Sequence, residues 1–234
     1  IHEIEGLDFL VALELLAENA NVELPAFNPE QAAVSHDLKD RLKVVNNETS
    51  KFFVQQLWNT ENGQRILEYV RKRAIKDEII KEFAIGFAPE SKDELYRHLL
   101  EKKQDKKDIL DSTVALARDS ASQDIVDRFH LRLMVPIQND RGDTVAFGGR
   151  ALKKGDEPKY LNSPEYALYN KSAILYNLNR AKKFIRERDF AVFVEGYFDV
   201  MASYQAGVEN VVATCGTALT EDQLKIMKRY TKNI

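Results

Sequence analysis

The stretch FAVFVEGYFDV, residues 190–200, decides the class of fold. Its first half is an apolar run of strand length that ends at Glu195, and a glycine then permits a tight turn before a helical pattern resumes. A second apolar run at residues 208–213 precedes a capping-box pattern at Thr220, which is typical of a helix start. Because a helical pattern over residues 178–185 comes first, this alternation predicts βαβ units and a mostly parallel sheet.

Two acidic residues stand at the end of the first of these strands. Glu195 closes the apolar run, and Asp199 lies four residues later, about one helical turn further on. Ligands of open α/β sheets gather beyond the carboxyl ends of the strands, and magnesium needs only one or two carboxylates beside substrate phosphates. The spacing alone leaves two interpretations open: a pair that serves chemistry, or acids that are solvated or cap the next helix.

Upstream of this region the apolar residues follow a helical period. They predict a leading helix around residues 9–17, a long helix that ends near residues 59–63, and short amphipathic helices around residues 66–70, 79–83 and 95–100. From Phe129 to Val135 the period becomes two, and a turn signal at residues 140–143 precedes residues 144–147, which predicts a hairpin. We therefore expect an α+β protein, with a small helical amino-terminal lobe followed by a mixed α/β lobe whose sheet is partly parallel.

Composition narrows the class of protein. The chain has 234 residues, of which 44% are hydrophobic and 30% charged, enough for one large or two small domains. No apolar run approaches the roughly 20 residues of a membrane span, and the first residues lack a secretory pattern, so a cytoplasmic protein without membrane contact is expected. One cysteine and four scattered histidines exclude a disulfide framework and make a structural metal site improbable.

Charge is distributed unevenly along the chain. The formal net charge is -3, yet residues 128–188 carry 13 Lys and Arg against 6 Asp and Glu, a surplus of +7. A local surplus of this kind is a plausible footprint for phosphate groups.

Several blocks resemble the bacterial replicative DNA primases. VEGYFDV at residues 194–200 is similar to the first motif of the toprim domain as it occurs in that family. Three further blocks resemble family motifs in the same order: FGGR at 147–150, KYLNSP at 159–164 and TCGTALT at 214–220. The likeness reaches back to GLDF at 6–9. It therefore covers nearly the whole chain. The pattern differs at Ala74, where glycine is expected, at Phe198, where methionine is expected, and at His130, where arginine is common.

The resemblance implies the catalytic core of a DNA primase, an enzyme that makes short RNA primers on single-stranded DNA from ribonucleoside triphosphates. It implies Glu195 as the catalytic acid that holds Mg²⁺ or Mn²⁺, with Asp199 in support. The family's second acidic motif, an Asp-x-Asp pair, is expected beyond Ile234. The metal site is thus expected to be incomplete, and the chain to be inactive alone.

The family pattern also implies the organisation of the chain. Residues 1–28 are expected to be a linker helix from a missing zinc-binding domain, the only place where zinc is expected. Residues 29–115 would form the helical part of the core, and residues 116–234 the mixed α/β part with the first half of a toprim domain. The replicative helicase is an expected partner through a missing carboxy-terminal domain, so the chain is expected to be trimmed at both ends.

We expect the nucleotide and the DNA template to bind to the basic blocks of the sequence. The positions implied by the resemblance are Arg73, Arg128, Arg132, Arg150, Lys159, Tyr160, Asn162 and Lys171. Cations suit the phosphate backbone and an aromatic ring suits a base. Gly148 and Gly149 would let the backbone beside Arg150 approach a ligand. Two alternatives stay open: a nuclease or topoisomerase relative with toprim chemistry, and a non-catalytic module that binds single-stranded DNA.

Overall fold

The computed structural model describes residues 29–118, 124–153, 155–216 and 218–234. The chain divides into two compact units, residues 1–38 and 39–234. The leading helix expected around residues 9–17 lies outside the described residues. The sheets and the candidate site belong to the second unit.

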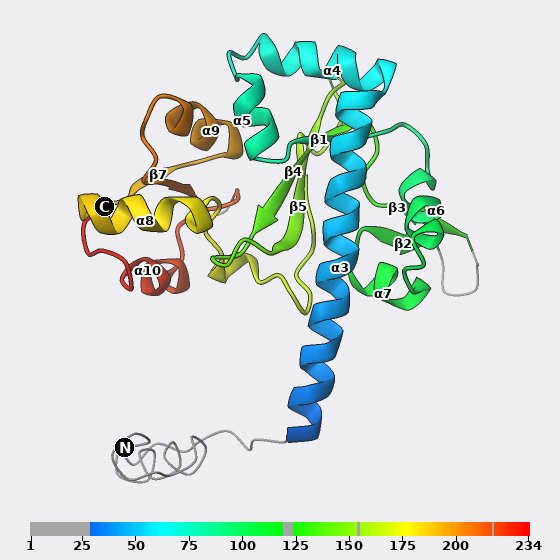
Figure 1. Cartoon of the computed structure of the whole chain (residues 1–234), viewed down its shortest axis with the longest axis horizontal. Helices are drawn as coiled ribbons and strands as arrows, with labels where there is room; N and C mark the ends of the chain where they lie inside the picture. The colour runs from blue at the N-terminus through cyan, green and yellow to red at the C-terminus, as the bar shows by residue number, and fades with distance from the viewer. Residues whose placement is uncertain (1–28, 119–123, 154, 217) are drawn as a thin grey trace. The chain divides into compact units, whose positions relative to one another are not determined.

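Helices dominate the first part of the described chain, as the sequence predicts (Figure 1). They are α3 (Pro29–Asn59), α4 (Glu61–Arg71), α5 (Asp77–Glu82), α6 (Glu94–Glu101) and α7 (Lys106–Asp111). The long helix α3 ends at the expected turn signal, but a single residue, Thr60, separates it from α4. Thr60 caps α4 by accepting a hydrogen bond from Gly63 N at 3.0 Å. Glycine is needed at position 63 of α4, because a Cβ there would lie 2.4 Å from the Leu57 carbonyl oxygen.

The predicted hairpin forms the centre of a four-stranded antiparallel sheet. Strand β4 (Arg132–Gln138) pairs with β5 (Thr144–Ala151), and the order is β1-β4-β5-β6, with β1 (Gly86–Ala88) and β6 (Tyr160–Asn162) at the edges. A separate antiparallel pair joins β2 (Ala115–Ala117) to β3 (Ile125–Asp127). The sequence analysis did not predict β1, β2, β3, β6 or α7. These elements are short, so their apolar residues complete no period of their own.

Both faces of the central hairpin are covered. Leu133, Val135 and Ile137 belong to one hydrophobic cluster, whereas Met134 and Phe147 belong to another. The alternation expected from Phe129 to Val135 is therefore wrong in detail: β4 begins only at Arg132 and is buried along nearly its whole length. A strand covered on both faces carries apolar residues without alternation.

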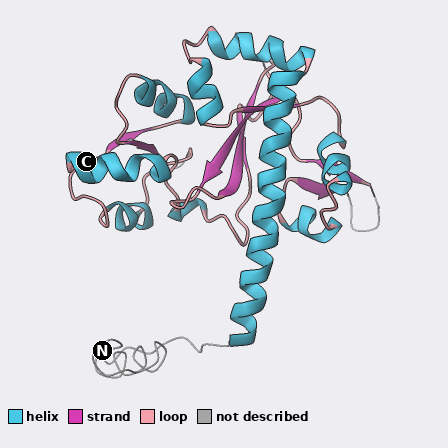
Figure 2. Ribbon diagram, in the orientation of Figure 1, coloured by secondary structure: helices cyan, strands magenta, loops and turns pink. Residues whose placement is uncertain are grey.

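The second half contains the predicted parallel pair (Figure 2). Strand β7 (Val192–Val194) lies parallel to β8 (Val211–Ala213). Helix α9 (Tyr197–Gln205) connects them, while α8 (Leu178–Arg188) precedes and α10 (Glu221–Met227) follows; η1 (Lys171–Ala173) is a short 3-10 helix. Thr220 caps α10 through the predicted capping box with Gln223. Helices α8 and α10 share a cluster with Val212, and α9 shares another with Val211, so the helices cover the pair from two sides.

The expected division near residue 115 stays a prediction. Within residues 39–234, β1 pairs with β4 across it, so Phe87 lies opposite Leu133. The larger hydrophobic cluster also joins Leu67 of α4 to Val200 of α9.

No helix within the described ranges combines the length and the apolar character that a membrane crossing requires.

Candidate active site

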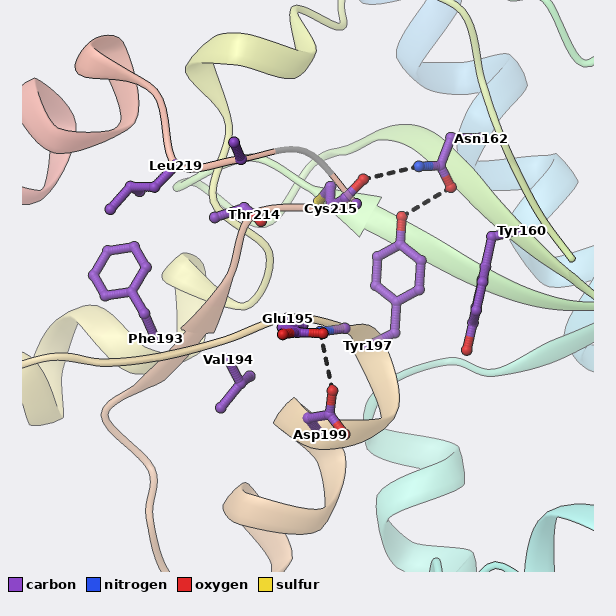
Figure 3. A pocket seen from close by; sticks show the side chains of 13 residues that line it. Tyr160, Asn162, Phe193, Val194, Glu195, Tyr197, Asp199, Thr214, Cys215 and Leu219 are labelled. Atoms are coloured by element: carbon purple, nitrogen blue, oxygen red, sulfur yellow. Dashed lines mark hydrogen bonds between the residues drawn. The ribbon is translucent and has the colours of Figure 1, made fainter.

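A pocket of about 820 Å³ opens beyond the carboxyl ends of β7 and β8 (Figure 3). Such an edge is where open α/β sheets usually bind ligands. Four residues expected at the site line it: Glu195, Asp199, Tyr160 and Asn162. Its other lining residues come from β7, from the start of α9 and from the loop after β8.

The two acids lie next to each other at one side of the pocket (Figure 3). Glu195 directly follows β7 and is exposed. Asp199 is the third residue of α9, and its Oδ2 accepts a hydrogen bond from Gly196 N at 3.1 Å. Asp199 therefore caps α9, as one interpretation of the spacing holds, and it also lines the pocket with Glu195; a chemical role for the pair stays a prediction.

A hydrogen-bonded chain of three residues builds another part of the pocket wall. The Tyr197 hydroxyl donates to Asn162 Oδ1 at 3.0 Å, and Asn162 Nδ2 donates to the Cys215 carbonyl oxygen at 3.0 Å. Asn162 thus links β6 to α9 and to the loop after β8. The sequence analysis missed Tyr197 and Cys215 as pocket residues. Tyr197 lies within the quoted motif, but its partner is 35 residues away, so only the fold brings them together.

Burial keeps the thiol and the phenol of this wall protonated even in alkaline solution. Desolvation raises the pKa of the Cys215 thiol to about 12, and it also raises the pKa of Tyr197 well above its usual value. Cys215 is fully buried and Tyr197 nearly so, and a buried thiol in apolar surroundings is a packing residue rather than a reactive one. A buried phenol already bonded to Asn162 is also poorly suited to act as a tyrosine nucleophile.

Arg150 lies beside the pocket through its contact with Tyr160. The two residues are opposite each other on β5 and β6, and the guanidinium carbon is 5.3 Å from the centre of the ring. Arg150 Nη1 also donates a hydrogen bond to the Tyr160 hydroxyl. Tyr160 is 39% exposed, so part of its side chain remains accessible to a ligand. Arg73 approaches the same region because it shares a contact with Phe198 of α9.

Arg128 and Arg132 are placed differently, with guanidinium groups that bind the main chain. Arg128 Nε donates to Thr113 O at 2.8 Å. Arg132 is 8% exposed, and its Nη1 donates to Gly149 O at 3.1 Å and to Pro158 O at 2.9 Å. Desolvation lowers the pKa of both side chains. Neither residue lines the pocket.

The expected role of the two glycines is wrong. A Cβ at Gly148 would lie 2.6 Å from the Tyr197 ring, and one at Gly149 would lie 2.9 Å from Arg132 Cδ. Both positions are occupied closely by side chains of the protein, so they leave no room for a ligand to approach the backbone.

The two lysines lie at the edges of the site. Lys159 is exposed and directly precedes Tyr160 on β6. Lys171 is half-buried at the start of η1, and its charge acts on the Cys215 thiol. Lys171 thus lies on the side of the pocket where the loop after β8 runs.

The acids fit a magnesium-type ion only in part. Hard divalent ions prefer oxygen ligands and retain waters, which Glu195 and Asp199 allow. Among the described residues, however, no group of three or more acidic, histidine or cysteine side chains is arranged to hold a metal. These two carboxylates would supply a minority of the ligands.

The fold and the acidic pocket define a toprim-like unit joined to an antiparallel sheet. A family model described as "DNA primase catalytic core, N-terminal domain" matches residues 52–182, and one described as "Toprim-like" matches residues 192–234. The first model covers more than half of the chain, and the chain therefore belongs to the DNA primase catalytic core family.

Known proteins agree with this assignment. The DNA primase of Halalkalibacterium halodurans is 39% identical over 234 residues, which are 100% of this chain and 39% of that protein. The RNA polymerase domain of Mycobacterium tuberculosis primase DnaG superimposes with a TM-score of 0.77 at 34% identity, covering 83% of this chain and 62% of that one. A DnaG primase catalytic domain bound to single-stranded DNA has a TM-score of 0.76 at 33% identity, covering 85% and 63%. The chain thus spans well under half the length of the Halalkalibacterium halodurans primase.

Proposed function

We propose that this chain is part of the polymerising core of a DNA primase, which joins ribonucleotides into short RNA primers on a single-stranded DNA template. The observation that carries the proposal is the exposed Glu195 at the end of β7, adjacent to Asp199 in a pocket flanked by Arg150 and Tyr160. Family membership supports the reaction class, and a structural relative at 33% identity is described as bound to single-stranded DNA.

The acids have the role of holding Mg²⁺ or Mn²⁺. Glu195 is exposed and would be the main ligand, while Asp199 would contribute the oxygen that does not cap α9. A bound divalent ion would stabilise the negative charge that develops on a phosphate during nucleotidyl transfer. The protein's own contribution is to keep both carboxylates on one rigid strand-to-helix turn.

The basic and aromatic residues have the role of holding substrates. Arg150 and Arg73 would bind phosphate groups, and Tyr160 would stack on a base through the accessible part of its side chain. Asn162 keeps the pocket wall closed through its two hydrogen bonds. Lys159 and Lys171 would add positive charge at the edges. Arg128 and Arg132 would support the sheet and the neighbouring loops, with a weaker electrostatic effect on the template.

The remaining partners follow from the family. Ribonucleoside triphosphates are the proposed substrates and the replicative helicase a proposed partner of the complete protein. Since bacterial replication takes place in the cytoplasm, we place the protein there.

The test is incorporation of labelled ribonucleotide on a single-stranded template, with Mg²⁺ or Mn²⁺, by the complete gene product. Glu195→Gln keeps the size of the side chain but removes its charge, and it should lower primer synthesis by about a hundredfold or more. Glu187→Gln is the matched control, because Glu187 is an exposed acid on α8 outside the pocket. Full activity of the Glu195→Gln variant would remove Glu195 from the mechanism. Template binding without synthesis by the unaltered protein would favour the non-catalytic alternative.

A further inference from the structure

One aromatic ring on α9 lies under two arginines that come from distant parts of the chain. The guanidinium carbon of Arg150 is 5.3 Å from the centre of the Phe198 ring, and that of Arg73 is 5.6 Å from it. Phe198 is the neighbour of Asp199 and is half-buried. The ring therefore brings two cations to the first turn of α9, one residue before Asp199.

These two cations have no acidic partner within the described residues: neither Arg73 nor Arg150 forms a salt bridge there. Like charges that share one ring repel each other, and each contact of a cation with a ring is weak at an exposed site. A bound anion would remove the repulsion. Guanidinium groups pair especially well with phosphate, because their donors match its oxygens.

The backbone around Arg73 is anchored to the same helix. Gln205 Nε2 donates to Ala74 O at 2.9 Å, and Gln205 Oε1 accepts from Lys76 N at 2.8 Å. Gln205 follows Phe198 by seven residues, so the two side chains lie on one face of α9. One helix thus holds both the turn and the side chain of Arg73.

We infer that Phe198 is a positioning residue, which holds Arg73 and Arg150 together as an anchor for phosphate groups beside the acid pocket. The inference rests on the proposed function and names a residue for it that the motif alone does not suggest. The phosphate belongs either to the triphosphate of a nucleotide or to the backbone of a DNA strand.

The contribution of the ring is limited because each arginine has a second aromatic contact. Arg73 lies 5.0 Å from the centre of the Tyr69 ring, and Arg150 retains Tyr160. Loss of the Phe198 ring should therefore loosen the pair without releasing it. We expect phosphate affinity to fall about three- to tenfold, as the loss of one or two weak cation–ring contacts implies.

The experiment uses the 234-residue chain with two probes, inorganic tripolyphosphate and an oligothymidylate strand, measured by titration calorimetry. Phe198→Met removes the ring but keeps the length and apolar character of the side chain, and methionine is the residue of the resembled motif. Phe198→Trp restores an aromatic face and should restore affinity. The control is Phe184→Met, because Phe184 also lies under a cation, Arg188 at 5.6 Å, on α8 outside the pocket.

A second measurement reports on the geometry without any ligand. The Nε–Hε signals of Arg73 and Arg150 in NMR spectra should carry a ring-current shift that changes in Phe198→Met, where only the Tyr69 and Tyr160 rings remain, and stays the same in Phe184→Met. The melting temperatures should stay equal, which separates positioning from folding.

The outcomes divide clearly. Weaker binding of tripolyphosphate alone assigns the anchor to a nucleotide, and weaker binding of the strand alone assigns it to DNA; either supports the inference. Unchanged affinity for both probes in Phe198→Met, an unchanged ring-current shift in that variant, or failure of the unaltered chain to bind either probe would overturn it. Primer synthesis by the complete gene product tests the proposed function separately. Phosphate binding that depends on Phe198, without any synthesis, would reject that function and leave this inference standing.

Discussion

The antiparallel sheet and the β7–β8 pair use their charged residues in different ways. In the sheet, Arg132 is buried and its guanidinium group binds two carbonyl oxygens of the main chain. At the end of β7, Glu195 is exposed at the edge of a pocket. Both residues belong to regions that resemble the primase family, yet one holds the fold together and the other is available to a ligand. The difference arises because the sheet is covered on both faces, whereas the β7–β8 pair ends in an open edge.

The largest effect should come from replacing the buried arginine, Arg132. Arg132→Met leaves Gly149 O and Pro158 O without their donor, and we expect the free energy of unfolding to fall by about 2–3 kcal/mol. Arg150→Met in the same sheet should cost less than about 1 kcal/mol, because its contacts are with partly exposed aromatic rings.

Urea unfolding of both variants checks this difference. Equal losses would show that the two arginines contribute equally to the free energy of unfolding. The contrast between the covered sheet and the open edge of the β7–β8 pair would then not hold.

A smaller effect should appear where the two regions touch. Gly148→Ala would drive a methyl group into the Tyr197 ring, so we expect the free energy of unfolding to fall by about 1–2 kcal/mol and the Tyr197–Asn162 hydrogen bond to weaken. Tyr197→Leu makes room, and the added cost of Gly148→Ala should then nearly vanish. A double-mutant cycle in urea measures this coupling. Additive losses would mean that the methyl group clashes elsewhere.

The smallest effect is a pH dependence of stability that comes from a buried residue of the pocket wall, Cys215. Burial raises the pKa of Cys215 from about 9 to about 12, so the folded chain keeps a proton that the unfolded chain releases. This contribution is complete below about pH 9 and is lost as pH rises towards 12, at no more than about 1.4 kcal/mol per pH unit. Urea unfolding at pH 8.5 and 10 should therefore show a smaller fall in Cys215→Ala than in the unaltered chain. If the free energy of unfolding fell equally in the two proteins, the Cys215 thiol would be exposed to solvent and its pKa would not be raised.

Much of the fold could be predicted from local pattern. The long helix, the hairpin, both strands of the parallel pair and the cap at Thr220 all follow from period and turn chemistry. Strand β1 could not be predicted, because three residues become a strand only by pairing with β4, more than 40 positions away.

The site divides in the same way. The position of Glu195 after an apolar run placed it at a strand end, which the structure confirms. The surroundings of each arginine depend on side chains from elsewhere in the chain, so sequence could not separate the buried Arg132 from Arg150. The sequence also could not show that Gly148 makes room for Tyr197, because a glycine that makes room for a ligand and one that makes room for a side chain look alike in a sequence.

The large hydrophobic cluster that joins α4 to α9 bears on how such a protein can be taken apart. The family models meet between residues 182 and 192, as if two modules were joined there. Yet Val200 and Met201 of α9 are fully buried in the same cluster as Leu67 and Val70 of α4. A toprim-like piece cut out at that junction would expose this apolar face to water. The two matched regions thus share one apolar face, so neither could be exchanged between primases without repacking that face.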